Sequence, residues 1–429
     1  MLDCACFSKY KTLAIAVSGG KDSMALLHYF IANSARLPKF YVINFEHGIR
    51  GEESKSDSEF VKCYCDDAGL ECEIVSLDCM TYCKGGGYTL EQGARLLRRA
   101  YYEDTVRQSK ADRVLTAHHK SDNAESILMH IARGSGLKGI CGIPTDDGVV
   151  MRPLLNISRE EIEQYCKVNN VPFREDKSNA DTSYDRNYMR NVIIPKLKDR
   201  YGALEDNLIG MASRASDAEE FIRSRCIKAD IVHGVAKLPL SALSSDKILA
   251  QYSVIDALER LGSRVDITAG HIEDIIALKD KKNGAKIDLP HGYCACKAYC
   301  ELHIYRQINL SIKQSLFGIG EVEWGNAILR VSPDVLPSAL RIDGEKVPQG
   351  AVWRTRRQGD TFLPFGGGRR TLGDWLTDKK VPLYRRDTLP LLALGNEILA
   401  VLPYEISRSL AVDDTSERIL YLSMESEQQ

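Results

Sequence analysis

The stretch Leu13-Ala14-Ile15-Ala16-Val17-Ser18-Gly19-Gly20-Lys21-Asp22-Ser23 decides the fold of the first part of this chain of 429 residues. The apolar run Leu13–Val17 predicts a short buried strand, and apolar residues at helical spacing follow Ser23. Between them, adjacent glycines let the backbone approach a ligand without Cβ clashes. Free amide groups and the positive end of the dipole at the start of the predicted helix favour an anion. We therefore expect the segment Ser18–Ser23 to bind the phosphates of a nucleotide.

Phosphate binding alone does not explain why an acidic residue, Asp22, stands in this loop. A carboxylate beside phosphates would be repelled unless it binds a cation, so we expect Asp22 to hold Mg²⁺. The loop is not a Walker A motif, because the spacing G-x-x-x-x-G-K-[ST] is absent. The alternative interpretation is a glycine-rich strand-to-helix turn that binds nothing.

Strands and helices alternate through the first part of the chain. The predicted strands are 13–17, 40–45, 73–77, 113–117 and 149–153, and the predicted helices that follow the loop and these strands include 54–68, 90–107, 122–133 and 159–169. Alternation of this kind with near-continuous apolar strands predicts a parallel sheet covered on both faces. Ligands bind such sheets at the carboxyl ends of the strands.

Two polar clusters follow the second and the fourth predicted strand. They are Glu46-His47-Gly48-Ile49-Arg50-Gly51 and His118-His119-Lys120-Ser121-Asp122-Asn123-Ala124-Glu125. We expect Asp122 to bind Mg²⁺ together with Asp22, and His119 to act beside them. A zinc site at His118, His119 and Asp122 is a second interpretation, but no H-E-x-x-H pattern supports it. In a third interpretation, Asp122 only caps the helix that follows.

Three further polar segments carry candidate substrate-binding residues. Arg95 lies in Glu91-Gln92-Gly93-Ala94-Arg95-Leu96-Leu97-Arg98-Arg99, Asn179 in Glu175-Asp176-Lys177-Ser178-Asn179, and Arg186 and Arg190 in Arg186-Asn187-Tyr188-Met189-Arg190-Asn191. The alternative is a solvated basic helix face followed by turns. Gly134–Gly139 matches G-x-G-x-x-G, but it follows a helix rather than a strand, so we expect a turn there and no dinucleotide site.

The pattern changes in the second half of the chain. The predicted elements there are helices at 191–197, 204–225, 247–261 and 272–278 and strands at 286–289, 398–401 and 419–422. One more strand is predicted over Tyr293–Tyr305, with the thiols of Cys294, Cys296 and Cys300 on one face rather than around a metal. We expect three domains, at 1–205, 206–315 and 316–429.

Composition excludes several classes of protein. Hydrophobic residues make up 44% and charged residues 27% of the chain, which excludes a disordered or collagen-like protein. Lys and Arg number 57 against 59 Asp and Glu, which excludes a general positive charge but not a local basic patch. No apolar run is long enough for a membrane helix or a signal peptide, so we expect a cytoplasmic protein without a membrane partner. The 13 cysteines include no C-x-x-C pair, which weakens zinc-ribbon and redox interpretations.

A basic segment lies near the C-terminus. From Arg354 to Arg386 there are nine Lys and Arg against three Asp, and Phe362, Phe365 and Trp375 interleave with them. Clustered positive charge with aromatic residues indicates nucleic-acid binding, and we expect Arg369 and Arg370 to contact phosphates. The alternative is a charged surface over a core of Trp and Phe.

Taken together, these motifs resemble one family. SGGKDS, HGIRG, EQGARLLRR, TAHHKSDNAES, RGSGLKG, RPLLNISREEI and EDKSNAD before RNYMRN resemble the tRNA(Ile)-lysidine synthetase family, and SGGKDS resembles the PP-loop of ATP pyrophosphatases. LPHGYCACKAY and RTRRQGDTFLPFGGGRRTLGDWLTDKKVP resemble that family's two C-terminal modules. The resemblance implies an α/β fold. Its parallel-sheet PP-loop ATP pyrophosphatase domain (adenine nucleotide alpha hydrolase-like) would precede two smaller α+β C-terminal domains that bind tRNA. The chain departs from the family at Ala400-Val401-Leu402-Pro403-Tyr404, where a Trp-Val-x-Gly-type turn often stands.

The resemblance also implies a reaction, that of a ligase forming a carbon–nitrogen bond. ATP with Mg²⁺ would adenylate the wobble cytidine of an isoleucine tRNA with the anticodon CAU and release pyrophosphate. The ε-amine of free L-lysine would then displace AMP to give lysidine, changing codon specificity from AUG to AUA. A homodimer is implied as well. We assign catalysis to Asp22, His119, Asp122 and Arg190, metal binding to Asp22 and Asp122, and substrate binding to His47, Arg50, Arg95, Asn179, Arg186, Arg369 and Arg370.

Two other functions stay open at this point. Another PP-loop tRNA enzyme, such as one that inserts sulfur, would usually need cysteines in C-x-x-C or similar arrangements, and that motif is missing. A non-catalytic RNA-binding protein with a relic ATP fold would have no reason to keep Asp22 and both serines of the loop.

Overall fold

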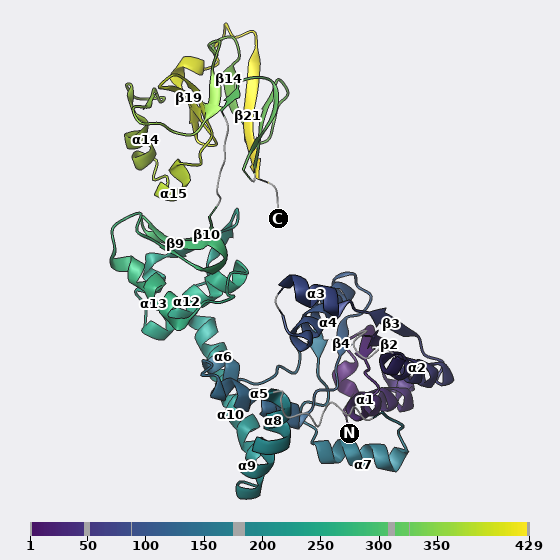
Figure 1. Cartoon of the computed structure of the whole chain (residues 1–429). Coiled ribbons are helices and arrows are strands. Elements are labelled where there is room, and N and C mark those ends of the chain that lie inside the picture. The colour runs from purple at the N-terminus through teal and green to yellow at the C-terminus, as the bar shows by residue number, and fades with distance from the viewer. Residues whose placement is uncertain are drawn as a thin grey trace. The chain divides into compact units, whose positions relative to one another are not determined.

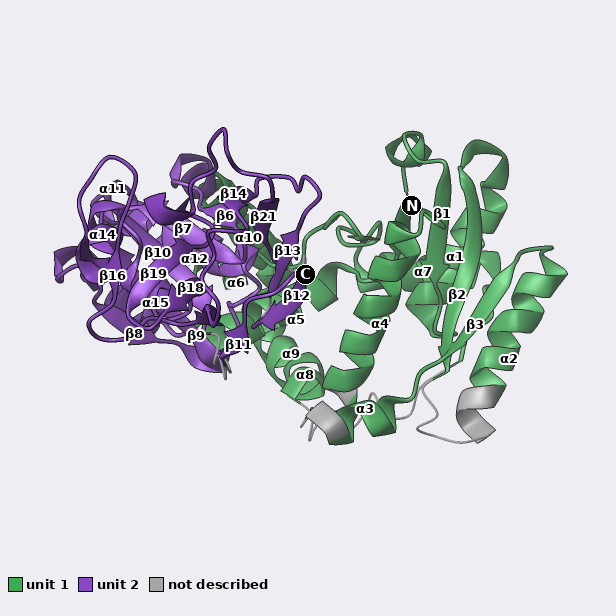
Figure 2. Ribbon diagram, turned by 90° about the horizontal axis from the view of Figure 1, so that it is seen from above, with its two compact units in different colours: residues 1–220 green, residues 221–429 purple. Residues whose placement is uncertain are grey.

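The structure is a computed structural model, and it describes residues 2–46, 52–86, 88–174, 185–307, 314–325 and 327–426. The chain forms two compact units, Met1–Glu220 and Phe221–Gln429, and each is described by itself (Figure 2). No helix in these described ranges is long and apolar enough to cross a membrane.

The first unit is built on a parallel sheet (Figure 1). Its described strands are β1 Thr12–Ala16, β2 Lys39–Glu46, β3 Cys72–Ser76, β4 Arg113–Leu115 and β5 Val150–Met151, in the order β3-β2-β1-β4-β5. Every neighbouring pair is parallel, so the predicted parallel sheet is confirmed. The larger helices are α1 Lys21–Ala32, α2 Glu52–Asp67, α4 Leu90–Arg107, α5 Lys120–Ala132 and α7 Arg159–Asn169.

The side chains of β1 explain why this sheet forms. Leu13 and Ile15 are fully buried in a core that also contains residues of α1, while Ala14 is fully buried in a second core with Ile43 and Val114. Because both faces of the strand are covered, the sequence is apolar at successive positions instead of alternating. The carboxyl end of β1 thereby places the loop Ser18–Ser23 at an edge of the sheet.

Local hydrogen bonds set the helix ends. Thr89 caps α4 and Ser158 caps α7, each in a reciprocal pair with the residue three positions on. The sequence analysis did not predict α3 Cys79–Gly86 or the short helix α6 Leu137–Ile140, which occupies part of the glycine segment predicted as a turn. A run of helical turns consists of α8 Asp185–Tyr188, a π-helical turn Met189–Ile193 and α9 Ile194–Arg200.

The long helix α10 Leu204–Arg225 runs from the first unit into the second, which begins with an antiparallel sheet. Its strands are β6 Asp230–Val232, β7 Val235–Pro239, β8 Lys286–Asp288, β9 Tyr293–Ala298 and β10 Glu301–Arg306, in the order β6-β7-β10-β9-β8, with helices α11 Leu240–Leu243, α12 Lys247–Arg260 and α13 Ala269–Ala277. The single strand predicted over Tyr293–Tyr305 is wrong, because Tyr299 takes a positive φ of 56° and the chain reverses into a hairpin. Cys294 and Cys296 are buried, whereas Cys300 is exposed.

Two further sheets complete the second unit. One contains β11 Ser315–Leu316, β15 Val352–Arg354, β16 Thr361–Phe362, β17 Arg370–Thr371, β18 Leu391–Leu394, β19 Glu397–Val401 and β20 Glu405–Ile406. The other contains β12 Gly320–Trp324, β13 Ala327–Ser332, β14 Leu340–Asp343 and β21 Ile419–Ser426, and the helices are α14 Leu372–Asp378 and α15 Leu383–Arg386. Short 3-10 turns occur at Cys4–Phe7, Ser34–Arg36, Leu278–Asp280, Pro290–Gly292 and Arg408–Leu410. The predicted smaller α+β domains after the parallel-sheet domain are confirmed as sheet-rich C-terminal domains; the three domain boundaries stay predictions.

Candidate active site

The loop after β1 forms an anion site at the start of α1. Gly19 has a φ of 84°, and its backbone lies against α2, where an added Cβ would meet Val61 Cγ2 at 3.4 Å. Ser23 Oγ accepts from the amide of Ser18 at 3.2 Å and donates to the carbonyl of Gly20 at 2.9 Å, so a side chain of the loop closes it. Within the described ranges, the amides of Lys21, Asp22 and Ser23 donate to no protein acceptor. These are the groups that bind an anion at a helix N-terminus.

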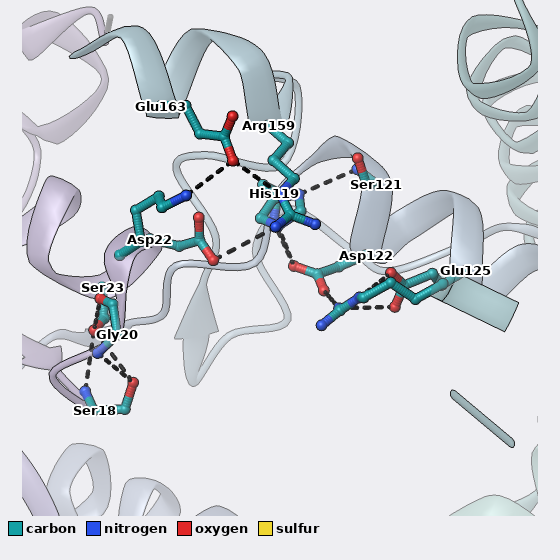
Figure 3. A network of polar contacts seen from close by, with 12 residues as sticks. Ser18, Gly20, Asp22, Ser23, His119, Ser121, Asp122, Glu125, Arg159 and Glu163 are labelled. Atoms are coloured by element: carbon teal, nitrogen blue, oxygen red, sulfur yellow. Dashed lines mark hydrogen bonds and ion pairs between the residues drawn. The ribbon is translucent and has the colours of Figure 1, made fainter. Parts of the chain in front are cut away.

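Two contacts tie this loop to α7 and the segment after it. The amide of Arg174 donates to the carbonyl of Gly19 at 2.9 Å. Lys21 Nζ donates to Glu163 Oε1 at 2.9 Å, and Arg159 Nε approaches the same oxygen at 3.2 Å (Figure 3). The structure therefore places the Lys21 ammonium beside α7, with a carboxylate as its partner.

His119 links the loop to α5. It is buried at the N-terminal end of that helix, and its Nδ1 accepts from the amide of Ser121 at 3.2 Å. A ring nitrogen that accepts carries no proton in the neutral ring, so the proton of neutral His119 is on Nε2. Nε2 lies 3.7 Å from Asp22 Oδ2 and 3.5 Å from Asp122 Oδ2 (Figure 3). One imidazole N–H thus faces carboxylates from two different strand ends.

Asp122 and Glu125 form the second half of the site with two arginines. Asp122 Oδ1 accepts from Arg190 Nη2 at 2.8 Å and Arg186 Nη2 at 3.3 Å. Glu125, which is 1% exposed, accepts from Arg190 Nε at 2.6 Å and Arg186 Nε at 3.0 Å. Asp122 Oδ2 also accepts from the amide of His119 at 3.0 Å. Asp122 therefore does cap the helix, as the third interpretation predicts. The same carboxylate caps the helix and holds two cations.

The two aspartates differ in their electrostatic environment. Burial raises the pKa of Asp22, and the charge of Asp122 adds to this although His119 opposes it. Burial acts against the ionised form of Asp122 too, but His119, Arg186 and the amide of His119 hold its pKa below the ordinary value. Burial lowers the pKa of His118 to about 4, so His118 is neutral at physiological pH. Carboxylates with pKa values pushed in opposite directions are typical of catalytic sites.

The oxygen atoms present fit Mg²⁺ at Asp22 better than at Asp122. Proteins bind Mg²⁺ through one or two carboxylates, with water and substrate phosphates as further ligands. The one ion pair of Asp22 within the described residues is with His119 Nε2, at 3.7 Å, whereas Asp122 accepts hydrogen bonds from protein donors at three of its about four lone-pair positions. No group of three or more His, Cys, Asp or Glu side chains in the described part of the chain forms a metal site by itself.

Comparisons with known proteins agree with this geometry. Residues 4–197 match the model of a PP-loop domain, and residues 351–422 match that of the TilS substrate C-terminal domain. The tRNA(Ile)-lysidine synthase of Caldanaerobacter subterraneus subsp. tengcongensis is 30% identical over 97% of this chain and 94% of that protein. The chain belongs to the tRNA(Ile)-lysidine synthase family. Its relatives in Bacillus licheniformis (30% identical, 90% of this chain and 88% of that protein) and Clostridium acetobutylicum (27%, 97% and 96%) carry the same name.

In this member of the lysidine synthase family, the structure brings some predicted site residues together and not others. Asp22, His119, Asp122, Arg186 and Arg190 form one connected cluster. Arg95 is exposed on α4, and Arg369 and Arg370 belong to the second unit. His47, Arg50 and Asn179 lie outside the described residues.

The basic C-terminal segment carries less net positive charge in the structure than a count of its own residues predicts. Both Nη atoms of Arg354 bind Asp360 in a buried pair, at 2.9 and 2.7 Å, so this arginine holds the module together. Arg369 pairs with Glu397 at 2.8 Å, and Lys379 pairs with Glu405 at 2.8 Å. These two glutamates lie beyond the basic segment Arg354–Arg386 and fold back onto it.

The aromatic residues of this segment divide between core and surface. Phe362 and Trp375 are buried against each other, with ring centroids 4.8 Å apart, which matches the alternative of a Trp and Phe core. Phe365 alone of the three is exposed. The contact of Arg369 and Arg370 with tRNA stays a prediction.

The sequence analysis did not assign roles to three residues of the site. Glu125 holds both arginines, Glu163 holds Lys21, and the amide of Arg174 holds Gly19. For Glu125 a signal exists, because it lies three positions after Asp122 and therefore on the same helix face. For Glu163 and Arg174 the sequence contains no comparable signal.

Proposed function

We propose that this chain ligates L-lysine to carbon 2 of the wobble cytidine of a CAU-anticodon isoleucine tRNA, using ATP and forming lysidine. Membership in the tRNA(Ile)-lysidine synthase family supports the activity. The observation that carries the assignment of the site is the link from Asp22 through His119 to Asp122, because it joins a phosphate-binding loop to a second charged cluster.

The reaction consists of two displacements. In the first, the oxygen on carbon 2 of cytidine attacks the α-phosphorus of ATP, and pyrophosphate leaves. In the second, the ε-amine of lysine attacks carbon 2, and AMP leaves with that oxygen. The amine has a pKa near 10.4 in water, so it must lose a proton before or during its attack.

The first half of the site suits the pyrophosphate. The amides of Lys21, Asp22 and Ser23 point to where an anion would lie, and they act without reorganisation as the charge develops. Asp22 would hold Mg²⁺, which supplies neutralisation of phosphate charge. We propose that Lys21 exchanges Glu163 for a phosphate oxygen when ATP binds.

The second half suits the leaving nucleotide. Arg186 and Arg190 use Nε and Nη2 on Asp122 and Glu125, so the N–H groups of Nη1 have no acceptor among the described residues. We propose that these groups bind the phosphate of AMP. The proton on Nε2 makes His119 a hydrogen-bond donor between the two halves rather than a proton acceptor at that atom.

Transfer of radiolabelled lysine to a CAU-anticodon tRNA tests the proposal. We expect incorporation only with ATP and Mg²⁺, together with ATP–pyrophosphate exchange that depends on the tRNA. A sulfur-inserting enzyme would not incorporate lysine, and a relic RNA-binding protein would show neither reaction. Either result would contradict the proposal.

We propose further that the chain works in the cytoplasm, where its tRNA substrate is, and as a homodimer. The first rests on the absence of a membrane-spanning helix in the described residues, and the second on family resemblance. Light scattering should give twice the mass of the chain; a monomer at working concentrations would contradict the dimer.

A further inference from the structure

The helices α3 and α4 pack against each other through small residues. Cys79 and Cys83, four positions apart on α3, are both buried. A Cβ on Gly93 of α4 would lie 2.3 Å from the Sγ of Cys83, so only glycine permits this approach. The Cys83 thiol also donates to the carbonyl of Thr89 at 3.3 Å. These contacts fix which face of α3 points inward.

Exposed aromatic and apolar side chains occur along this pair of helices. Tyr82 and Tyr88 are 41% and 44% exposed, and their rings stack in parallel with centroids 5.9 Å apart at 13°. Met80, Leu90 and Leu96 are also exposed on the same two helices or at their ends. Single exposed apolar side chains are ordinary, but two exposed tyrosines that stack on each other form one aromatic surface.

This surface lies at the edge of the sheet that carries the active site. The chain passes from the carboxyl end of β3 directly into α3 (Figure 2). β3 is two strands from β1, or about 10 Å between strand axes, and the strands are parallel. A ligand bound at the loop Ser18–Ser23 therefore has α3 on its flank.

Charge indicates what covers the surface. Lys84 and Arg95 are exposed on α3 and α4, and the charge of Lys84 acts on the nearby carboxylate of Asp78. Asp78 at the start of α3 already accepts from the amide of Thr81 at 3.0 Å. Exposed aromatic rings on a helical hairpin that also carries exposed cations suit unstacked bases and their phosphates. An apolar protein partner would bury these cations without compensation.

We propose that Tyr82 and Tyr88 form a stacking platform for the unpaired nucleotides next to the wobble cytidine. This inference rests on the proposed function, because it takes the anticodon loop of the tRNA as the occupant. The reacting base must leave the loop stack to reach the PP-loop, and its neighbours then lose a stacking partner. Aromatic side chains that replace this partner hold the loop open while the reaction proceeds.

Fluorescence of 2-aminopurine tests the platform directly. The probe replaces the adenosine that follows the wobble cytidine in the anticodon CAU, and stacking quenches it. We expect quenching when the wild-type chain binds the labelled tRNA, and its loss in Tyr82→Leu and Tyr88→Leu. Leucine keeps apolar area but removes the ring, so Kd should rise about ten-fold for each change. The KM for ATP should stay unchanged.

Matched variants separate stacking from general effects. Tyr82→Phe keeps the ring and should retain quenching and affinity, whereas Tyr201→Leu removes an exposed tyrosine far along the chain and should change neither. Quenching that persists in both leucine variants would overturn the platform. Leucine variants that lose the dimer mass in light scattering but keep quenching would also overturn the platform. In that case the two tyrosines would contact a second copy of the chain.

The readouts also distinguish this inference from the proposed function. A wild-type chain that quenches the probe but transfers no lysine would contradict the proposed function and leave the platform standing. A chain that transfers lysine at wild-type rate in both leucine variants, with unchanged quenching, would overturn the platform alone.

Discussion

Asp22 and Asp122 face the same N–H of His119, yet their environments act on them in opposite directions. Burial and the neighbouring carboxylate raise the pKa of Asp22, while His119 and Arg186 outweigh burial at Asp122 and lower its pKa. An acid whose pKa is raised on folding destabilises the folded protein above that pKa. An acid whose pKa is lowered on folding stabilises the folded protein at every pH above the pKa that the acid has in the unfolded chain. The two residues should therefore respond oppositely to the same substitution.

Asp22→Asn is expected to be inactive and more thermostable at pH 7. The change removes a carboxylate whose ionised form is disfavoured by burial, so Tm should rise. This gain should shrink as pH falls and vanish below about 3.9, where unfolded Asp is protonated as well. Calorimetry across pH and lysine transfer at pH 7 measure both effects. A Tm below that of the wild type at pH 7 would show that Asp22 is not disfavoured in the folded state.

Asp122→Asn is expected to lose activity by about 10²-fold or more and to be less stable at pH 7 by about 1–3 kcal/mol. The amide keeps an acceptor for the helix cap but no longer neutralises Arg190 and Arg186. Because folding lowers the pKa of Asp122, the variant should show its whole loss of stability above about pH 4. The difference from the wild type should disappear as pH falls through the pKa of Asp122 in the folded protein. Retained tRNA binding by filter assay is the control; full pyrophosphate release would refute the role of Asp122.

At this scale, residues near strand ends were predictable and their long-range partners were not. Asp22, His119 and Asp122 follow predicted strands, and parallel topology brings such ends together. Lys21 meets Glu163 across 142 positions, and Arg190 meets Glu125 across 65. Glu125 lies on the same helix face as Asp122, which is a signal for its place at the site, but the sequence does not indicate its two arginine partners or the partner of Glu163.

Among the elements, α3 and α4 approach each other closely at Gly93, where an added Cβ would lie 2.3 Å from the Sγ of Cys83. Gly93→Ala should destabilise the chain by about 1–3 kcal/mol, because its Cβ would overlap Cys83 Sγ. Cys83→Ala removes the obstructing sulfur, so the double variant should recover much of the loss. Urea unfolding of the two single variants and the double variant measures the coupling. Additive losses would show that the overlap is relieved elsewhere.

Three helices, α4, α7 and α10, have the predicted bounds, and two of them carry strong start signals. The bounds of α4 and α7 match the prediction residue for residue, because Thr89 and Ser158 form capping boxes that mark the helix starts. The hairpin β9–β10 was missed, because neither Tyr299 nor Cys300 is a usual turn residue. A positive φ at tyrosine is a tertiary effect that local propensity does not reveal.

For the whole molecule, ion pairs in the C-terminal module reduce the positive charge that a count of its basic residues predicts. Arg369 and Arg370 pair with Glu397 and Asp378 beside a pocket of about 550 Å³. A phosphate that bound either arginine would therefore compete with a carboxylate that is already in place. A count of charges along the segment overestimates the field, because Glu397 and Glu405 fold back onto it from beyond its end.

Neutralising Arg369 and Arg370 to Gln should weaken tRNA binding and reduce its salt slope by about one unit for each residue. Glu397→Gln should act in the opposite direction, because it frees Arg369 for a phosphate. Filter binding at several salt concentrations measures the slopes. An unchanged slope in the double variant would exclude phosphate contact at these positions, and the ATP–pyrophosphate exchange of a tRNA-saturated enzyme serves as control.

The bond from the amide of Arg174 to the carbonyl of Gly19 has a consequence for how the nucleotide arrives. With its oxygen anchored, the peptide unit between Gly19 and Gly20 cannot invert, and the turn keeps its shape before ATP comes. The entropy of ordering this turn is then lost during folding and not during binding. Calorimetric titration should accordingly show the modest heat-capacity change of a rigid receptor, without the larger change that accompanies coupled folding.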